Sequence, residues 1–256
     1  MQIVGYEPTA IGPALVLADS GAIERQSLAP GTRLEYTLGK RRCAGAVDGT
    51  THHACDRSAT PYCEFHRQTW VCARCTGSCL KDEMDCHEEH AVYLAAFAPH
   101  TFKVGVTKRW RLETRLREQG ADRAAHIHTV SDGRIARQLE AAIAADAGVK
   151  DRIRRREKVG GLARSVDVDA WQVFLENFDV IETFDLTYDF ARPLRTRPVR
   201  ETIAAGTVVG LQGRLIVLER AGTMYAVDMR DLVGYEVDTS GESDGRRLQS
   251  SLGSFG

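Results

Sequence analysis

All seven cysteines of the 256-residue chain lie between Cys43 and Cys86. Cysteines that serve only as core residues would be scattered along the chain. The segment that holds them has too few large apolar side chains for a core of its own, so a bound metal is the expected source of its stability. The odd number of cysteines and the lack of a secretory leader favour metal thiolates over disulfides.

The spacing of these cysteines and nearby histidines divides the ligands into two sets. Two residues separate Cys63 from His66, and two separate Cys72 from Cys75, so each pair can reach one ion from a single turn. The first set is Cys43, Cys55, Cys63 and His66, and the second is Cys72, Cys75, Cys86 and His90, with Cys79 as the alternative to His90. We therefore expect two structural zinc ions with four protein ligands each. A catalytic zinc with three protein ligands and an open position is the alternative.

Charge is distributed unevenly along a chain whose formal net charge is −1. Residues 101–165 carry 16 basic and 8 acidic side chains, a net charge of +8, whereas residues 1–100 have a net charge of −3 and residues 166–256 one of −6. A positive segment attracts anionic partners, so we expect nucleic acid, DNA or RNA, to bind through residues 101–165. The alternative is charge patterning on solvated helices.

The remaining composition is typical of a soluble protein, with 43% hydrophobic and 27% charged residues. No apolar run approaches the ~18 residues that a membrane span requires. The first residues lack the basic segment and apolar run of a signal peptide. We therefore expect a cytoplasmic protein without membrane contact, and the oligomeric state stays open.

The two ends of the chain have the pattern of β-strands. Short alternating or apolar runs separated by Gly and Pro occur in residues 1–40 and again in residues 200–238. Neither set alone makes a satisfactory sheet, because each would leave exposed edges. We expect the two ends to pair in one small β-domain, followed by a mobile tail at residues 239–256.

The middle of the chain, residues 91–190, has the pattern of an α/β domain that follows a zinc module at residues 41–90. We expect a hairpin, then a helix at residues 109–119 that ends at Gly120. A strand at residues 125–130 and a helix capped by Ser131 or Asp132 follow, and residues 168–184 form a further amphipathic helix. The predicted fold class is α+β.

Short motifs in this middle segment carry a family resemblance. Val92-Tyr93-Leu94, Lys103-Val104-Gly105, Arg115 and Glu140 occur in the order of the GIY-YIG endonuclease superfamily, which residues 90–150 resemble. The chain more narrowly resembles a prokaryotic domain-of-unknown-function family. That family has a Cys/His-rich region before His-Ala-Val-Tyr-Leu-Ala (residues 90–95), then Lys-Val-Gly-Val-Thr (103–107) and Gln-Gly-Ala (119–121). The resemblance implies a GIY-YIG-like α/β core behind the zinc module.

The superfamily resemblance also implies a role for each motif residue. Tyr93 would help deprotonate water, Lys103 would contact phosphate, Arg115 or else Arg111 would neutralise phosphate charge, and Glu140 would bind Mg²⁺. Lys103 departs from the superfamily, which has Tyr there, and the arginine-rich stretch 152–156 stands where its later Asn is expected. The alternative is that Tyr93 is an ordinary core residue and Glu140 an ordinary solvated side chain.

The function implied by these residues is Mg²⁺-dependent phosphodiester cleavage of nucleic acid by a divergent GIY-YIG-type endonuclease. One alternative is a nucleic-acid-binding protein that keeps the scaffold without the cleavage. Another is a zinc-braced scaffold for protein interactions, on which the positive charge of the middle segment is incidental.

Overall fold

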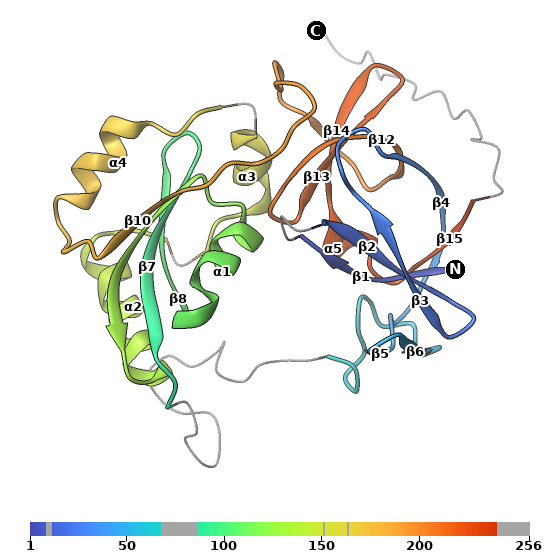
Figure 1. Cartoon of the computed structure of the whole chain (residues 1–256), viewed down its shortest axis with the longest axis horizontal. Helices are drawn as coiled ribbons and strands as arrows, with labels where there is room; N and C mark the ends of the chain where they lie inside the picture. The colour runs from blue at the N-terminus through green and yellow to red at the C-terminus, as the bar shows by residue number, and fades with distance from the viewer. Residues whose placement is uncertain (9–11, 68–86, 151, 163, 240–256) are drawn as a thin grey trace, which may run out of the picture.

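The computed structural model describes residues 1–256 except residues 9–11, 68–86, 151, 163 and 240–256. The described residues form a mixed α+β fold that is mostly sheet with few helices, in two sheets of eleven and four strands (Figure 1). The tail expected at residues 239–256 lies, from residue 240 onward, outside the described residues.

The larger sheet combines the two ends of the chain. Its strands are β1 (Gln2–Glu7), β2 (Ala14–Asp19), β3 (Ala22–Ser27), β4 (Arg33–Arg41), β5 (Ala46–Asp48), β6 (Thr51–His53), β11 (Val199–Arg200), β12 (Ala204–Gln212), β13 (Leu215–Arg220), β14 (Thr223–Asp228) and β15 (Tyr235–Asp238). Their order is β11-β14-β13-β12-β4-β15-β1-β2-β3-β6-β5. Strand β4 pairs with both β12 and β15, and β1 pairs with β15. Strands expected from opposite ends of the chain therefore lie side by side (Figure 1).

A core shared by both ends explains this pairing. Leu15 and Leu34 from the first strands are buried in one cluster with Ile216 and Leu218 from β13. In β4 the buried side chains alternate with exposed ones, as a strand with one solvated face requires. Each such leucine contributes roughly 1.5 to 3 kcal/mol on burial, and neither end alone supplies both sides of the cluster.

The smaller sheet is antiparallel and belongs to the middle of the chain. Its strands are β7 (His90–Phe97), β8 (Thr101–Lys108), β9 (Arg123–Val130) and β10 (Glu182–Asp185), in the order β10-β9-β7-β8. All eight residues of β7 are buried, because β7 lies inside the sheet and both of its faces are covered. The expected hairpin is thus confirmed as β7 and β8, which pair from His90 to Phe97.

Alternate residues of β7 face different helices. Val92 and Leu94 pack toward α2 (Gly133–Asp146) and α4 (Val168–Leu175). Tyr93 packs on the opposite face with α1 (Leu112–Gln119), which follows a 3-10 turn at Arg109–Arg111.

The helix boundaries agree in part with the sequence. Gly120 ends α1 with a φ of 72°, as expected. The cap of α2 is Asp132, whose carboxylate accepts from the Ile135 amide at 2.8 Å.

The helix predicted for residues 168–184 is wrong at its C-terminal end. Helix α4 stops at Leu175, and residues 182–185 form β10 along the edge of β9. The Ile181 amide donates to the His126 carbonyl at 2.8 Å. This segment therefore pairs with backbone groups at the edge of β9, which would stay without these hydrogen bonds if the helix continued.

Helix α3 (Arg155–Gly161) forms where the sequence indicated only a basic stretch. The reason is a tertiary contact, since Val159 of α3 is buried with Leu215 and Ala226 of the larger sheet. The sequence pattern around residues 155–161 cannot reveal a contact with residues so far away in the chain, so it did not predict this helix. Helix α3 lies between the two sheets and connects them (Figure 1).

Candidate functional site

Four metal-ligating side chains come together directly after β4. The ligand atoms of Cys43, Cys55, Cys63 and His66 all lie within 4.8 Å of one another. The Nδ1 atom of His66 is 3.4 Å from Cys43 Sγ and 3.2 Å from Cys63 Sγ, and the Sγ atoms of Cys55 and Cys63 are 4.0 Å apart. Ligands of a tetrahedral zinc ion lie about 3.5 to 3.8 Å apart, given Zn–S and Zn–N bonds of about 2.3 and 2.0 Å. This cluster can therefore hold a metal ion such as zinc.

Tight backbone geometry brings these four residues together. The hairpin of β5 and β6 returns the chain toward Cys43, and Gly45 lies so close to it that a Cβ atom would be 2.1 Å from the His53 carbonyl oxygen. A single turn after Cys63, closed by the His66 amide donating to the Cys63 carbonyl at 3.1 Å, places both ligands on one side. The cluster also continues the larger sheet, because β6 pairs with β3.

Backbone amides around the cluster favour thiolate ligands. The Cys63 amide donates to Cys43 Sγ at 3.2 Å, and the Gly45 amide does so at 3.5 Å. Burial raises the pKa of Cys43, the more enclosed thiol. Burial would also raise the pKa of Cys63, but hydrogen bonds from the backbone of His66 and Phe65 lower it to about 7. Because the thiolate is the form that binds metal, this lowered pKa favours metal binding by Cys63 near neutral pH.

Most of the second predicted zinc set lies outside the described residues, namely Cys72, Cys75 and Cys86 together with the alternative ligand Cys79. His90 is described and begins β7, where it is buried. Its Nδ1–H donates to the Glu88 carbonyl at 2.6 Å, which leaves Nε2 as the nitrogen for a ligand. The second site stays a prediction.

Tyr93 and Lys103 lie together on the α1 side of the smaller sheet. The Tyr93 side chain is buried, and its hydroxyl accepts a hydrogen bond from Gln119 Nε2 at 2.5 Å. The ammonium of Lys103 is 5.8 Å from the centroid of the Tyr93 ring. Tyr93 pairs across the hairpin with Gly105, the glycine of the second motif. The two strand motifs thus meet in space, within the core.

The other two motif residues lie on separate helices. Arg115 and the fallback residue Arg111 both pair with Glu118 on α1, at 3.3 and 2.9 Å. Glu140 is on α2, which packs against the other face of the sheet, and its carboxylate is 2.5 Å from Arg137 Nη1. The structure therefore places Tyr93, Lys103 and the helix of Arg115 on one face, and the helix of Glu140 on the opposite face.

Lys158 is a residue of this region that sequence reasoning missed. It extends from α3 to donate to the Gln119 carbonyl at 2.5 Å, and its ammonium lies 4.8 Å from the centroid of the Phe97 ring. Burial, reinforced by the positive charges of Arg214, Lys103 and Arg115, lowers its pKa to about 7. Nothing in the sequence separates this lysine from its basic neighbours.

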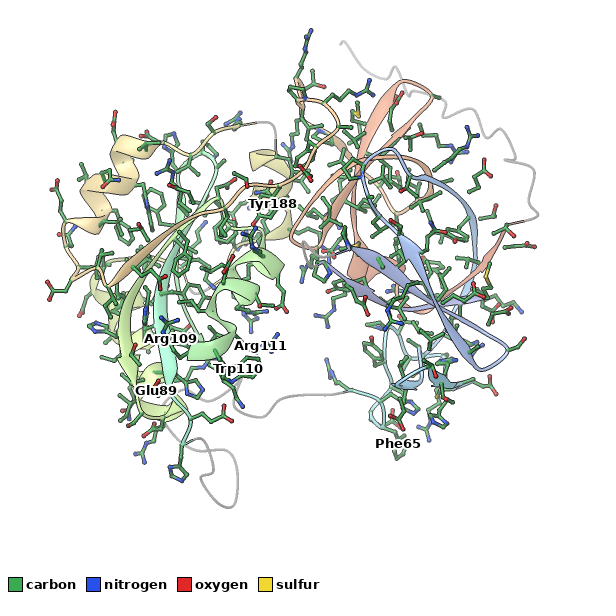
Figure 2. The ribbon with its side chains drawn as sticks, in the orientation of Figure 1. Phe65, Glu89, Arg109, Trp110, Arg111 and Tyr188 are labelled. Atoms are coloured by element: carbon green, nitrogen blue, oxygen red, sulfur yellow. The ribbon has the colours of Figure 1, made fainter. Side chains whose placement is uncertain are left out.

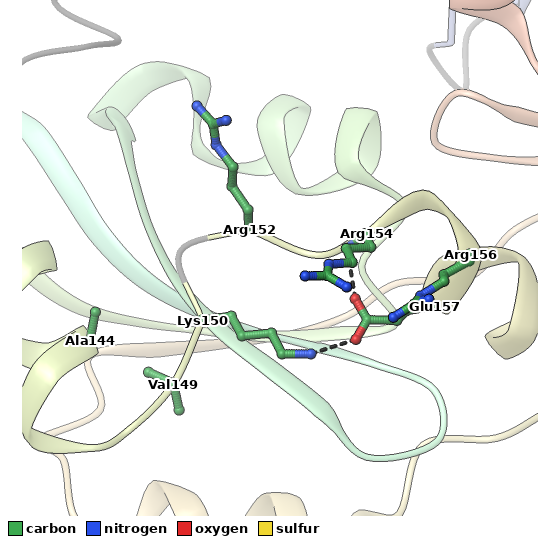
Figure 3. A pocket seen from close by; sticks show the side chains of 7 residues that line it. All are labelled: Ala144, Val149, Lys150, Arg152, Arg154, Arg156 and Glu157. Atoms are coloured by element: carbon green, nitrogen blue, oxygen red, sulfur yellow. Dashed lines mark hydrogen bonds and ion pairs between the residues drawn. The ribbon is translucent and has the colours of Figure 1, made fainter.

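A basic cavity of about 510 Å³ opens beside α3 (Figure 3). Its lining residues are Ala144, Val149, Lys150, Arg152, Arg154, Arg156 and Glu157. The exposed side chains of Arg152, Arg154 and Arg156 have no carboxylate partner among the described residues.

The residues between these arginines point inward. Ile153 packs in the cluster that contains Tyr93 and Leu116. Arg155 Nε is 2.6 Å from Asp228 Oδ2, and Arg155 also pairs with Asp231. Ile153 is a sequence signal for an inward position, whereas nothing in the sequence separates Arg155 from Arg154 and Arg156.

Two aromatic side chains are exposed next to arginines. Trp110 is 73% exposed and Phe65 is 71% exposed. The guanidinium of Arg111 lies 5.9 Å from the Trp110 ring centroid, and that of Arg57 lies 4.2 Å from the Phe65 ring centroid. Figure 2 shows Trp110 beside Arg109 and Arg111 near α1, and Phe65 on the other side of the molecule, in the turn between Cys63 and His66. The run Arg109-Trp110-Arg111 is the sequence signal for the first.

The family model described as "Protein of unknown function (DUF2797)" matches residues 31–237. The chain belongs to the DUF2797 family. The match begins just before β4 and extends into β15, so the DUF2797 region includes the cysteine cluster, the smaller sheet and the basic cavity. No curated protein and no solved structure matches the chain. None of the helices in the described part of the chain is sufficiently long and apolar to cross a membrane.

Proposed function

We propose that this DUF2797 protein binds nucleic acid through the basic surface around Arg152, Arg154 and Arg156. The observation that supports this proposal is the exposure of three arginines at one cavity without a carboxylate partner among the described residues. A guanidinium offers a planar fork of N–H donors that matches the oxygens of a phosphate group. Like charges gathered in this way repel one another, and an anionic ligand removes that repulsion.

The exposed aromatic residues favour nucleic acid over other polyanions. An exposed ring beside a guanidinium, as in Trp110 with Arg111, provides a surface on which a base can stack. Each stacked base contributes about 1 to 3 kcal/mol in proteins that bind single strands. A polyanion without bases would gain no stacking contact from such a ring.

The cysteine cluster has a supporting role in this proposal. Three cysteines and one histidine supply four ligands and leave no open position, which is typical of structural zinc. Zinc would stabilise the segment that carries Phe65 and Arg57 and hold it against the larger sheet, where the Arg42 guanidinium joins the Cys55 carbonyl to Glu236.

Salt-dependent binding tests the proposal. A fluorescent single-stranded oligonucleotide is titrated with the zinc-loaded full chain at several salt concentrations between 50 and 200 mM, and the affinity is measured by anisotropy. We expect the logarithm of the binding constant to fall linearly with the logarithm of salt concentration, with a slope of about −0.7 for each phosphate contacted. Binding that ignores salt would instead favour the protein-interaction scaffold.

A second candidate function is metal-dependent phosphodiester cleavage. It is favoured by the meeting of Tyr93 and Lys103 on one face, beneath the helix that carries Arg115. It is disfavoured by Glu140, which is paired with Arg137 on the opposite-face helix. Among the described residues the cysteine cluster is the sole group of three or more metal-ligating side chains. Mg²⁺ needs only one or two protein carboxylates, so the place of Glu140 on the face opposite Tyr93 and Lys103 is the reason that we favour binding.

Cleavage is tested separately from binding. A labelled oligonucleotide is incubated with the protein and Mg²⁺, and the products are compared for wild type and Glu140→Gln. Cleavage that disappears in Glu140→Gln but persists in Glu113→Gln, an exposed control on α1, would support the enzyme. Intact substrate in every reaction, with binding retained, would support the binding protein.

A further inference from the structure

We propose that the basic cavity beside α3 binds a phosphomonoester, either the terminal phosphate of a nucleic-acid strand or the phosphate of a free nucleotide. The proposal that a strand end is the ligand rests on the proposed function. The proposal that the cavity binds a phosphomonoester depends only on the residues that line the cavity. The cavity has about 510 Å³, within the range of about 300 to 1,000 Å³ that is common for small-molecule sites. It therefore has room for more than a phosphate, and Ala144 and Val149 give it an apolar wall beside which a sugar can lie.

Among the described residues that line the cavity, Glu157 is the one carboxylate, and it is already engaged by the protein itself. Glu157 Oε1 pairs with Lys150, and Glu157 Oε2 accepts from the Arg154 amide at 2.7 Å. These contacts lower the pKa of Glu157, with the Lys150 hydrogen bond as the largest cause, so it stays ionised and engaged. Glu157 thus offsets Lys150 and part of the charge of Arg154, and the charges of Arg152 and Arg156 are left for a ligand.

The amount of charge favours a monoester over a diester. A phosphomonoester carries a charge of about −1.5 to −2 at pH 7, compared with one negative charge on each internal phosphate of a strand. Its three terminal oxygens can accept from several guanidinium groups at once. Figure 3 shows Arg154 and Lys150 beside Glu157, whereas the Arg152 side chain leaves the backbone in another direction.

The backbone that carries these arginines is fixed on both sides of the cavity. The Val104 amide at the edge of β8 donates to the Lys150 carbonyl at 3.2 Å. Ile153 is packed in the core cluster beside α1, and Arg155 is anchored to Asp228. A site whose backbone is held in this way loses less conformational entropy when it binds a ligand.

The test compares one single-stranded oligonucleotide with a 5′-phosphate and with a 5′-hydroxyl, at fixed salt. We expect the phosphorylated form to bind the wild type about tenfold more tightly, as charge-assisted hydrogen bonds from guanidinium groups imply. The double variant Arg152→Gln, Arg154→Gln should lose this preference. The matched control Arg195→Gln, Arg220→Gln removes two exposed arginines elsewhere and should keep it.

A third arm separates the two sources of the phosphate and separates this inference from the proposed function. Adenosine monophosphate is titrated calorimetrically against wild type and the double variant. Binding of adenosine monophosphate to the wild type but not to the double variant would support the cavity site, even if no oligonucleotide binds. Equal affinity for both oligonucleotides, together with no adenosine monophosphate binding, would overturn the inference while leaving nucleic-acid binding intact. Absence of binding by all three probes would overturn both.

Discussion

The ring of Tyr93 lies directly over Gly105 on the neighbouring strand. A Cβ atom at residue 105 would be 2.5 Å from the Tyr93 hydroxyl oxygen and 2.6 Å from Cζ. The two residues are paired in register across the hairpin of β7 and β8. The tyrosine of the first motif and the glycine of the second therefore form one packing unit, in which the glycine makes room for the ring.

This relationship predicts the effect of Gly105→Ala. The added methyl group has to displace a buried ring, so the free energy of unfolding should fall by about 1 to 3 kcal/mol, as overpacked cores show. Urea denaturation measures the change. Gly160→Ala is the matched control, because a Cβ atom there would have only the distant tip of Arg197 at 3.9 Å. Equal stability of Gly105→Ala and wild type would contradict the packing described.

The cysteine cluster predicts a defined change in metal content. Elemental analysis should find two zinc ions per wild-type chain, and Cys63→Ser should lose one of them, because it removes a buried ligand of the first set. Cys79→Ser, at the position predicted only as an alternative ligand, should retain both. A chain whose zinc content is unchanged by Cys63→Ser would show that this cluster does not hold the metal.

Neighbouring arginines of the basic segment should respond differently to substitution. Arg155→Gln leaves Asp228, whose side chain is 1% exposed, with Arg214 as its remaining ion-pair partner, and we expect a loss of about 2 kcal/mol in stability. Arg154→Gln removes an exposed side chain and should change stability by less than about 0.5 kcal/mol. Thermal and urea unfolding compare the two variants. Equal losses would argue against the inward role of Arg155.

Lys158 predicts how stability depends on pH. Its pKa is lowered to about 7 in the folded chain, against about 10.4 in an unfolded one. Between these values the unfolded chain binds more protons, so folding becomes more favourable as the pH rises from about 7 toward 10. Below about pH 7 both states are protonated and this contribution stays constant.

The matched variant for this prediction is Lys158→Met, which cannot titrate. The free energy of unfolding of the wild type, measured in urea, should rise relative to that of Lys158→Met between pH 7 and pH 9. Using the difference between the two proteins cancels the titration of the cysteines. Parallel pH profiles would mean that Lys158 keeps an ordinary pKa.

Local signals were sufficient for much of the fold. The cap at Asp132, the stop at Gly120 and the hairpin of β7 and β8 follow from patterns within a few residues of each feature. The first zinc set was also predicted, since ligand spacing is a property of the sequence.

Features that depend on distant contacts were not predicted from the sequence. Helix α3 is stabilised by Leu215 and Ala226, and β10 by the free edge of β9, both far away in the chain. The same holds for Lys158, whose low pKa comes from burial beside Gln119. The superfamily resemblance gave Tyr93 and Glu140 roles in the same reaction, which requires the two side chains to lie on one face. Sequence order alone does not specify which face of a sheet a following helix covers, and α2 packs on the face away from Tyr93.

The salt dependence of binding in the variant Arg152→Gln, Arg154→Gln, Arg156→Gln, with Arg155 retained, tests the proposed function most directly. Each arginine that contacts a phosphate contributes about 0.7 to the slope of log binding constant against log salt for a single strand. We expect the slope to become shallower by about 2 and the affinity at low salt to fall, with zinc content and stability unchanged. A variant that keeps the wild-type slope and affinity would contradict binding through this surface.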